Sequence, residues 1–147
     1  MKVVVQRVKN SSVKVDEVII SKIDQGLNLL VCMEKGDELT QVNQAIKKVL
    51  ALRIFSDDLG RMNNSICDID GEILCISQFT LSWNGKKGNR PSFDNSMEPE
   101  SARRLFDDFV AGLKSNYKTD KIKTGSFGSS MEVAITNDGP VTFSISF

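Results

Sequence analysis

The chain has 147 residues, and its 19 lysines and arginines equal its 19 aspartates and glutamates, so its formal net charge is zero. This balance gives no global field to attract nucleic acid or a membrane surface, so a polyanionic partner has to meet a local basic patch. The absence of histidine excludes Ser-His-Asp and Cys-His catalysis and argues against a zinc site.

Strand-forming residues dominate the first 33 positions. Apolar and β-branched runs predict four strands, at 2–8, 12–16, 18–23 and 26–33, and their spacing predicts an antiparallel meander. The N-terminal apolar run is too short for a signal peptide or a membrane span, because Gln6 and Arg7 break it. We therefore expect a cytoplasmic protein without a membrane partner.

The three cysteines, Cys32, Cys67 and Cys75, lack the spacing of a metal site. Cys32 and Cys75 lie inside apolar runs, so we expect reduced thiols in the core. No metal and no cofactor are expected.

The hydrophobic period changes at Leu39, from which apolar residues recur at helical spacing as far as Leu50. A turn is expected at 57–63 and a buried strand at 72–81. The polar loop at 82–99 is of a length that is usually functional or disordered.

A second helix is expected from about Pro99, because proline is favoured in the first helical turn. Three closing strands are expected at 121–125, 131–137 and 141–147. The apolar stripe of the helix is interpreted as core: Ala102, Leu105, Phe106, Phe109, Val110 and Leu113. The sequence thus predicts one domain spanning residues 1–147, with a mixed α/β fold, a mainly antiparallel curved sheet or barrel, and two main helices.

Polar residues end the strand in "EILCISQFTLSW", where Ser77, Gln78 and Thr80 follow a buried apolar run. Such groups are costly to bury unless they find partners, so they either bond to neighbouring backbone or face a site. Thr80 is a weak nucleophile without an activating base, and no histidine is available. Backbone N–H groups acting as an oxyanion hole are therefore favoured over side-chain chemistry.

Two further segments are candidates. "TNDGPVTF" has ordinary turn chemistry and predicts a hairpin, although Gly139 would also allow a close approach to a ligand. "GKKGNRPSF", with Lys118, Lys121 and Lys123 as possible neighbours, is either a solvated surface or a patch that contacts a phosphate backbone.

Taken in order, these segments resemble the D-aminoacyl-tRNA deacylases, also called D-tyrosyl-tRNA deacylases. The motifs that carry the resemblance are "MKVVVQRV", "LRIFSDDLGRMN", "SQFTL", "KKGNRPSF", "TGSFGSSMEV" and "NDGPVT". The resemblance implies a carboxylic ester hydrolase that releases D-amino acids from the 3′ end of tRNA and also clears glycine mischarged on tRNA for alanine. It implies a homodimer with active sites at the subunit interface, and no DNA partner. In related L-alanine-editing enzymes, "PQATL" replaces "SQFTL".

The resemblance also assigns residues. Ser77, Gln78, Phe79 and Thr80 form the catalytic wall of the pocket, and Gly139 and Pro140 form a Gly-cisPro element inserted into the partner subunit. The resemblance also implies two further sets of contacts: for substrate binding and chiral selection, Arg7, Phe127, Met131 and Asn137; and for tRNA binding, Lys86, Lys87 and Arg90. Either Thr80 or the ribose 2′-hydroxyl of the tRNA then assists hydrolysis. The alternatives are a non-catalytic RNA-binding dimer, a small esterase using Thr80, and a structural interaction protein.

Overall fold

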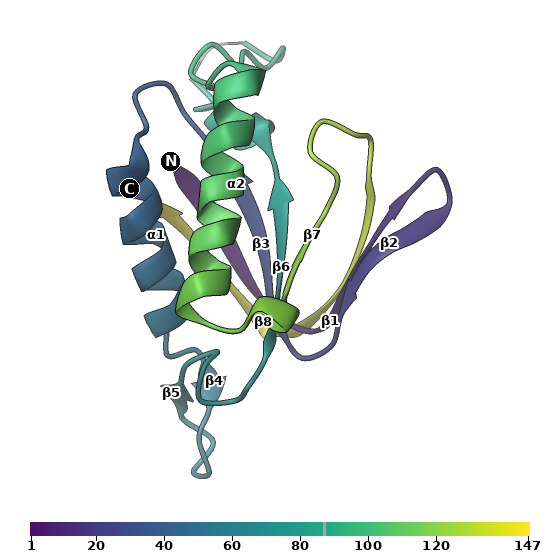
Figure 1. Ribbon diagram of the computed structural model, residues 1–147, viewed down its shortest axis with the longest axis vertical. Helices are drawn as coiled ribbons and strands as arrows, with labels where there is room; N and C mark the ends of the chain where they lie inside the picture. Colours follow the sequence, from purple (N-terminus) through teal and green to yellow (C-terminus); the bar gives the residue numbers. More distant parts are fainter. Residues whose placement is uncertain (87) are drawn as a thin grey trace.

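The computed structural model describes residues 1–86 and 88–147. Two helices, α1 (Leu39–Ala51) and α2 (Pro99–Asn116), pack together on one face of a strongly curved sheet, shown in Figure 1. The strand order is β2 (Val18–Ile23), β1 (Lys2–Val15), β3 (Gly26–Cys32), β6 (Glu72–Ser77) and β7 (Ile122–Thr124), with β8 (Glu132–Ser146) along the other edge of β1. The predicted α/β class, curved sheet and two helices are confirmed.

The N-terminal strands are antiparallel, as predicted, whereas two later pairs of strands are parallel. β1 pairs antiparallel with β2, β3 and β8, but β3 with β6 and β6 with β7 are parallel. Parallel neighbours need a long crossover, usually helical. Here α1 lies between β3 and β6 in the chain, and α2 lies between β6 and β7. The helices therefore explain why β6 and β7 join the sheet in parallel, and the sheet as a whole is mainly antiparallel, as predicted.

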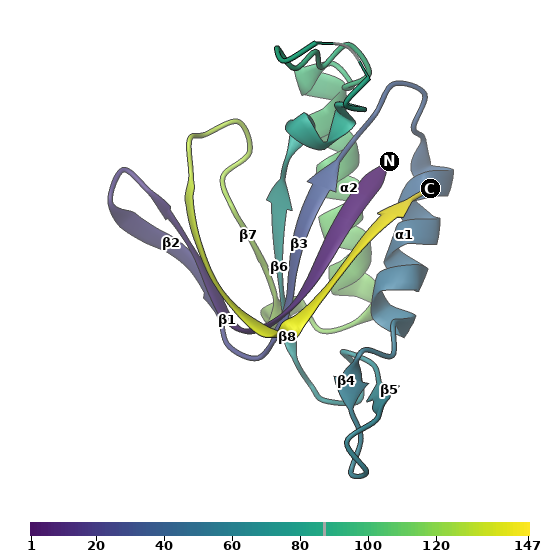
Figure 2. The ribbon, with the colours of Figure 1, turned by 180° about the vertical axis from the view of Figure 1, so that it is seen from behind.

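The chain forms single long strands where pairs of strands were predicted. β1 runs through the predicted break at 9–11, and β8 runs through the predicted hairpin at 138–140. Figure 2 shows β8 crossing the back of the molecule alongside β1. Both halves of β8 pair with β1, so the turn residues form a bulge and do not reverse the chain.

The core lies between the helices and the sheet. The buried residues of α2 are Phe106, Phe109, Val110 and Leu113, while Ala102 and Leu105 are half-buried. This confirms most of the predicted stripe. Cys32 and Cys75 are buried as predicted, whereas Cys67 is exposed, and all three are free.

The predicted turn carries a short hairpin that was not predicted, formed by β4 (Phe55–Ser56) and β5 (Met62–Asn64). Gly60 lies in that turn with a positive φ of 73°. Among the described residues, no helix is both long and apolar enough to cross a membrane.

Candidate functional site

A cavity of about 730 Å³ opens where β6 ends. Its walls come from the end of β6, the loop before α2, the first turns of α2 and the segment that leads into β8. The lining residues that carry the argument are Ser77, Gln78, Phe79, Glu98, Phe127 and Met131. The structure thus brings five of the predicted site residues together, from segments about 50 positions apart in the sequence.

The predicted strand ends at Ser77, and a 3₁₀ turn at Phe79–Ser82 follows it. The backbone N–H of Gln78 donates to the carbonyl of Val31 at 2.7 Å, which continues the sheet by one residue. The next two N–H groups, those of Phe79 and Thr80, have no acceptor within the described part of the chain. Phe79 lines the cavity and Thr80 follows it in the chain, so these N–H groups are the candidate donors to an oxygen that gains negative charge there.

Thr80 is exposed and is not among the residues that line the cavity. Its Oγ1 accepts a hydrogen bond from Nε2 of Gln78 at 2.5 Å. An amide nitrogen cannot take the hydroxyl proton, so this contact orients Thr80 without activating it as a nucleophile.

The thiol nearest this turn among the described residues is protonated. Cys32 is buried, and its Sγ lies 3.5 Å from the carbonyl oxygen of Phe79, to which it donates. Burial, reinforced by the carboxylate of Glu34, raises the pKa of Cys32 to about 11. The nucleophilic form of cysteine is the thiolate, so Cys32 supports the turn and does not attack a substrate at neutral pH.

Two aromatic contacts shape the cavity. The ring of Phe79 meets Phe93 edge to face, with 5.0 Å between the centroids, and Phe127 lies against Phe106 at 5.9 Å. Such pairs are favoured by the ring quadrupole and hold the rings in place. The predicted pocket residue Phe127 is therefore fixed by α2.

Met131 is held by the backbone beside it. The N–H of Ser126 lies 3.3 Å from the sulfur of Met131, and a Cβ added to Gly125 would stand 2.7 Å from that sulfur. A side chain at position 125 would therefore force Met131 to shift.

The second predicted element lies on β8, outside this cavity. Gln6 pairs with Thr142 and Val8 with Asn137, so residues 138–141 stand opposite Arg7 alone. Within this bulge, the peptide bond between Gly139 and Pro140 is cis, and Gly139 has a φ of 124°.

Arg7 is buried and fastens the bulge to the rest of the fold. Its Nε donates to the carbonyl of Asp138 at 3.2 Å and lies 3.0 Å from the carboxylate of the same residue. Its Nη1 donates to the carbonyl of Ile54 at 2.5 Å. A guanidinium presents several donors in a fixed plane, which suits a residue that must hold two segments at once.

The exposed residues of the bulge do not reach the cavity of their own chain. Asn137, Gly139 and Pro140 are all exposed, and none of them lines it. In one chain, therefore, the two predicted halves of the site lie apart.

The predicted basic patch is less coherent than expected. Lys86 and Arg90 are exposed in the loop near the start of α2, and Lys87 lies outside the described residues. Lys118 and Lys121 follow the other end of α2, where their amines lie 2.8 and 3.6 Å from Asp70. They do not extend the loop patch.

Some lining residues were missed from the sequence. Phe93, Met97 and Glu98 come from the long loop, where an apolar or acidic residue has no periodic pattern to identify it. Glu98 immediately precedes α2 and is the one charged side chain among the described lining residues. Its carboxylate gives the cavity a negative group suited to a substrate amine.

Comparisons with known proteins agree across almost the whole chain. The family model described as D-Tyr-tRNA(Tyr) deacylase matches residues 4–146. A D-aminoacyl-tRNA deacylase from Persephonella marina is 51% identical over 142 residues, covering 97% of this chain and 95% of that protein. One from Lactobacillus gasseri is 46% identical over 142 residues, covering 97% of each.

Solved structures give the same fold. A structure titled c-Myc DNA Unwinding Element Binding Protein superimposes with a TM-score of 0.97 at 40% identity, covering 100% of this chain and 99% of that one. A probable eukaryotic D-amino acid tRNA deacylase superimposes with a TM-score of 0.83 over 98% of both chains. Its identity is 14%, so it supports the fold alone.

Proposed function

The chain belongs to the D-Tyr-tRNA(Tyr) deacylase family, and on that premise we propose that it hydrolyses the ester joining a D-amino acid to the 3′ end of tRNA. The products are free tRNA and the D-amino acid. One observation supports the proposal at this site: the N–H groups of Phe79 and Thr80 have no acceptor among the described residues, and Phe79 lines a substrate-sized cavity.

The chemistry needs few groups. An aminoacyl ester is already reactive, so the enzyme has to position water and stabilise the oxyanion of the tetrahedral intermediate. In our proposal the N–H groups of Phe79 and Thr80 bind that oxyanion. Water attacks the ester carbon, the bond to the ribose 3′-oxygen breaks, and the neighbouring 2′-hydroxyl assists the proton transfer. Glu98 accepts a hydrogen bond from the substrate amino group.

We further propose that the active unit is a homodimer, in which β8 of one protomer lies near the cavity of its partner. The position of the bulge supports this, because Gly139 and Pro140 are exposed and stand outside the cavity of their own chain. β8 pairs only with β1 among the described strands, and none of its 15 residues is buried. A long uncovered edge strand of this kind needs a cover.

In the dimer, the Gly139–Pro140 segment acts as a chirality filter. Its carbonyls accept from the amino group of the substrate and leave no space for the side chain of an L-amino acid. A D side chain points outward, and glycine has none, so D-aminoacyl-tRNA and glycyl-tRNA mischarged on tRNA for alanine are both accepted. Specificity then comes from rejecting the wrong substrate. The single domain acts in the cytoplasm without a cofactor.

Deacylation of matched D- and L-tyrosyl-tRNA by the purified protein tests this function. We expect rapid release from the D ester, slow release from the L ester, and no inhibition by duplex DNA. Equal hydrolysis of both esters would contradict the chirality filter and favour an L-editing activity. Binding of tRNA without hydrolysis of either ester would contradict the enzyme and favour the non-catalytic RNA-binding dimer.

Thr80→Ala is expected to retain most of the activity, with kcat within about tenfold of the wild type, because the backbone N–H that binds the oxyanion remains. Steady-state deacylation of D-tyrosyl-tRNA measures this, with uncharged tRNA affinity as the control for binding. A loss of about 10⁴-fold or more, with the fold and tRNA affinity unchanged, would instead make Thr80 the nucleophile.

A further inference from the structure

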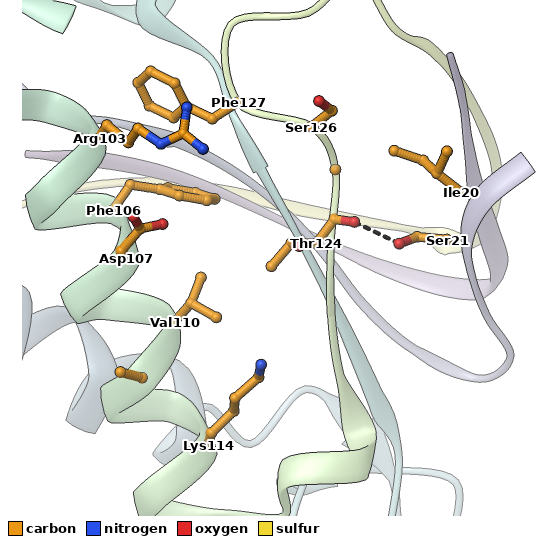
Figure 3. Close-up of a pocket in the computed structure, with 12 residues that line it drawn as sticks. Ile20, Ser21, Arg103, Phe106, Asp107, Val110, Lys114, Thr124, Ser126 and Phe127 are labelled. Atoms are coloured by element: carbon orange, nitrogen blue, oxygen red, sulfur yellow. Dashed lines mark hydrogen bonds between the residues drawn. The ribbon is translucent and has the colours of Figure 1, made fainter. Parts of the chain in front are cut away.

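A second cavity, of about 640 Å³, lies on the other side of the segment that follows β7. α2 forms one wall, β7 and the residues after it form another, and β2 contributes Ile20 and Ser21 (Figure 3). Phe127 lines both this cavity and the one at the end of β6. The two cavities are therefore neighbours that share an aromatic side chain.

The wall formed by α2 is cationic. Arg103, Asp107 and Lys114 are spaced by four and seven residues, which places them along one side of a helix. Figure 3 shows Arg103 near Phe127 at one end of the cavity and Lys114 at the other, with Asp107 between them. The α2 wall of the cavity thus carries two positive charges and one negative charge. In the part of the chain that the structure describes, neither Arg103 nor Lys114 makes an ion pair.

The opposite wall offers an aromatic ring and hydroxyl groups. The guanidinium carbon of Arg103 lies 5.7 Å from the centroid of the Phe127 ring, which holds the charge next to the shared side chain. Ser21 donates to the carbonyl of Thr124 across the cavity, and Ser126 adds a second hydroxyl, which lies 2.7 Å from the hydroxyl of Ser129 in the wall of the neighbouring cavity. Together these groups suit a ligand that has a negative charge, hydroxyls and a flat ring.

We propose that this second cavity binds the nucleotide that precedes the terminal adenosine of the aminoacyl-tRNA, with Arg103 and Lys114 contacting its phosphates. The inference rests on the proposed function, which places the ester in the neighbouring cavity and with it the terminal adenosine that carries the ester. Charged donors make the strongest hydrogen bonds to phosphate, and such contacts fix the position of a strand without reading its sequence. Arg103 stacks on Phe127, the side chain that both cavities share, so it lies where the tRNA 3′ end would pass from one cavity to the other.

The double variant Arg103→Gln with Lys114→Gln tests the proposal on two substrates, D-tyrosyl-tRNA and D-tyrosyl adenosine ester. For the tRNA, we expect KM to rise about tenfold or more with kcat nearly unchanged, because binding contacts to charged groups are lost. The adenosine ester lacks the preceding nucleotide, so its kinetics should not change. The slope of log affinity for uncharged tRNA against log salt should fall by about 1.4, at about 0.7 for each lost phosphate contact on a single strand.

Arg104→Gln is the matched control. Arg104 follows Arg103 directly in α2. It is exposed, pairs with Glu100 and does not line the cavity. Its variant should behave as the wild type on both substrates.

Two results would overturn the inference while leaving the proposed function in place. In one, the double variant hydrolyses D-tyrosyl-tRNA as well as the wild type does. In the other, the adenosine ester is impaired as strongly as the tRNA, which would assign Arg103 and Lys114 to the terminal nucleoside. A wild-type protein that hydrolyses neither substrate would refute the function itself. The affinity for uncharged tRNA would then still decide the role of the cavity. Weaker binding by the double variant than by the wild type would support it as a tRNA contact, and equal binding would overturn it.

Discussion

Replacing Gly139 with alanine is expected to lower kcat/KM for D-tyrosyl-tRNA by about a hundredfold, because a displacement of about 1 Å at a substrate-positioning segment costs this much. An added Cβ would stand 2.9 Å from a side-chain carbon of Val141, 3.0 Å from its backbone nitrogen and 3.3 Å from Nη2 of Arg7. The φ of 124° at Gly139 is also one that alanine rarely adopts. The segment has to shift, and the contacts that the proposal assigns to its carbonyls shift with it.

The stability of Gly139→Ala should fall as well, by about 1–3 kcal/mol, the usual cost of a residue held in an unfavourable backbone region. Gly60→Ala is the matched control, since Gly60 has a positive φ of 73° but nothing within 4 Å of an added Cβ. Chemical denaturation of both variants, combined with their kinetics, separates strain from function. A Gly139→Ala protein with wild-type kcat/KM would exclude Gly139 from substrate positioning.

The periodic elements of the fold were predictable from the sequence. The helix from Leu39, the helix from Pro99 and the strands at 18–23 and 26–33 all occur where the hydrophobic pattern predicted them. The two helices bury one face, so their side-chain period is visible in the sequence. β3 is buried along nearly its whole length and β2 is mostly exposed, so these strands were predicted from their strand-forming residues. The resemblance to the deacylase family, read from ordered short motifs, is confirmed by the family model and the curated relatives.

The errors in the fold share one physical cause. The residues at 138–140 have the composition of a hairpin turn, and composition reports local preference but not what a strand pairs with. Pairing of both halves of β8 with β1, and the anchoring of the bulge by Arg7, are long-range effects. The parallel pairing of β3, β6 and β7 likewise follows from the path through the helices.

The candidate site was predictable only in part. Ser77 and Gln78 stood out because polar residues at the end of a buried strand are unusual, and the family resemblance assigned them, together with Phe79, to the site. Phe127 and Met131 came from the family resemblance, and the structure places them in the same cavity. Glu98 and the cationic wall formed by Arg103 and Lys114 were not predicted, since charged residues on a helix usually signal only its solvated face.

Arg7→Met is expected to reduce the free energy of unfolding by about 2–4 kcal/mol, because it leaves the buried carbonyl of Ile54 and the groups of Asp138 without their donor. The contribution from the Asp138 carboxylate itself is modest, since 33% of that side chain is exposed and water screens it. Methionine retains most of the buried volume, so the loss reports hydrogen bonds more than packing. Equilibrium denaturation in urea measures it.

Lys14→Met provides the control on the same pair of strands. The Lys14 amine lies 3.3 Å from Glu132 across β1 and β8, where 35% of the Lys14 side chain and 63% of the Glu132 side chain are exposed. Water screens this pair, so its loss should cost less than about 1 kcal/mol. A comparable loss in both variants would mean that Arg7 contributes only as a surface charge.

The activity of Arg7→Met should fall about a hundredfold, as for Gly139→Ala, because both changes release the same segment from its position. Combining the two substitutions then tests this shared cause. Residues that act through one structural unit give effects that do not add. The double variant should therefore be little worse than either single variant. If the two losses multiply to about 10⁴-fold, Arg7 and Gly139 act independently, and Arg7 does not work through the Gly139–Pro140 segment.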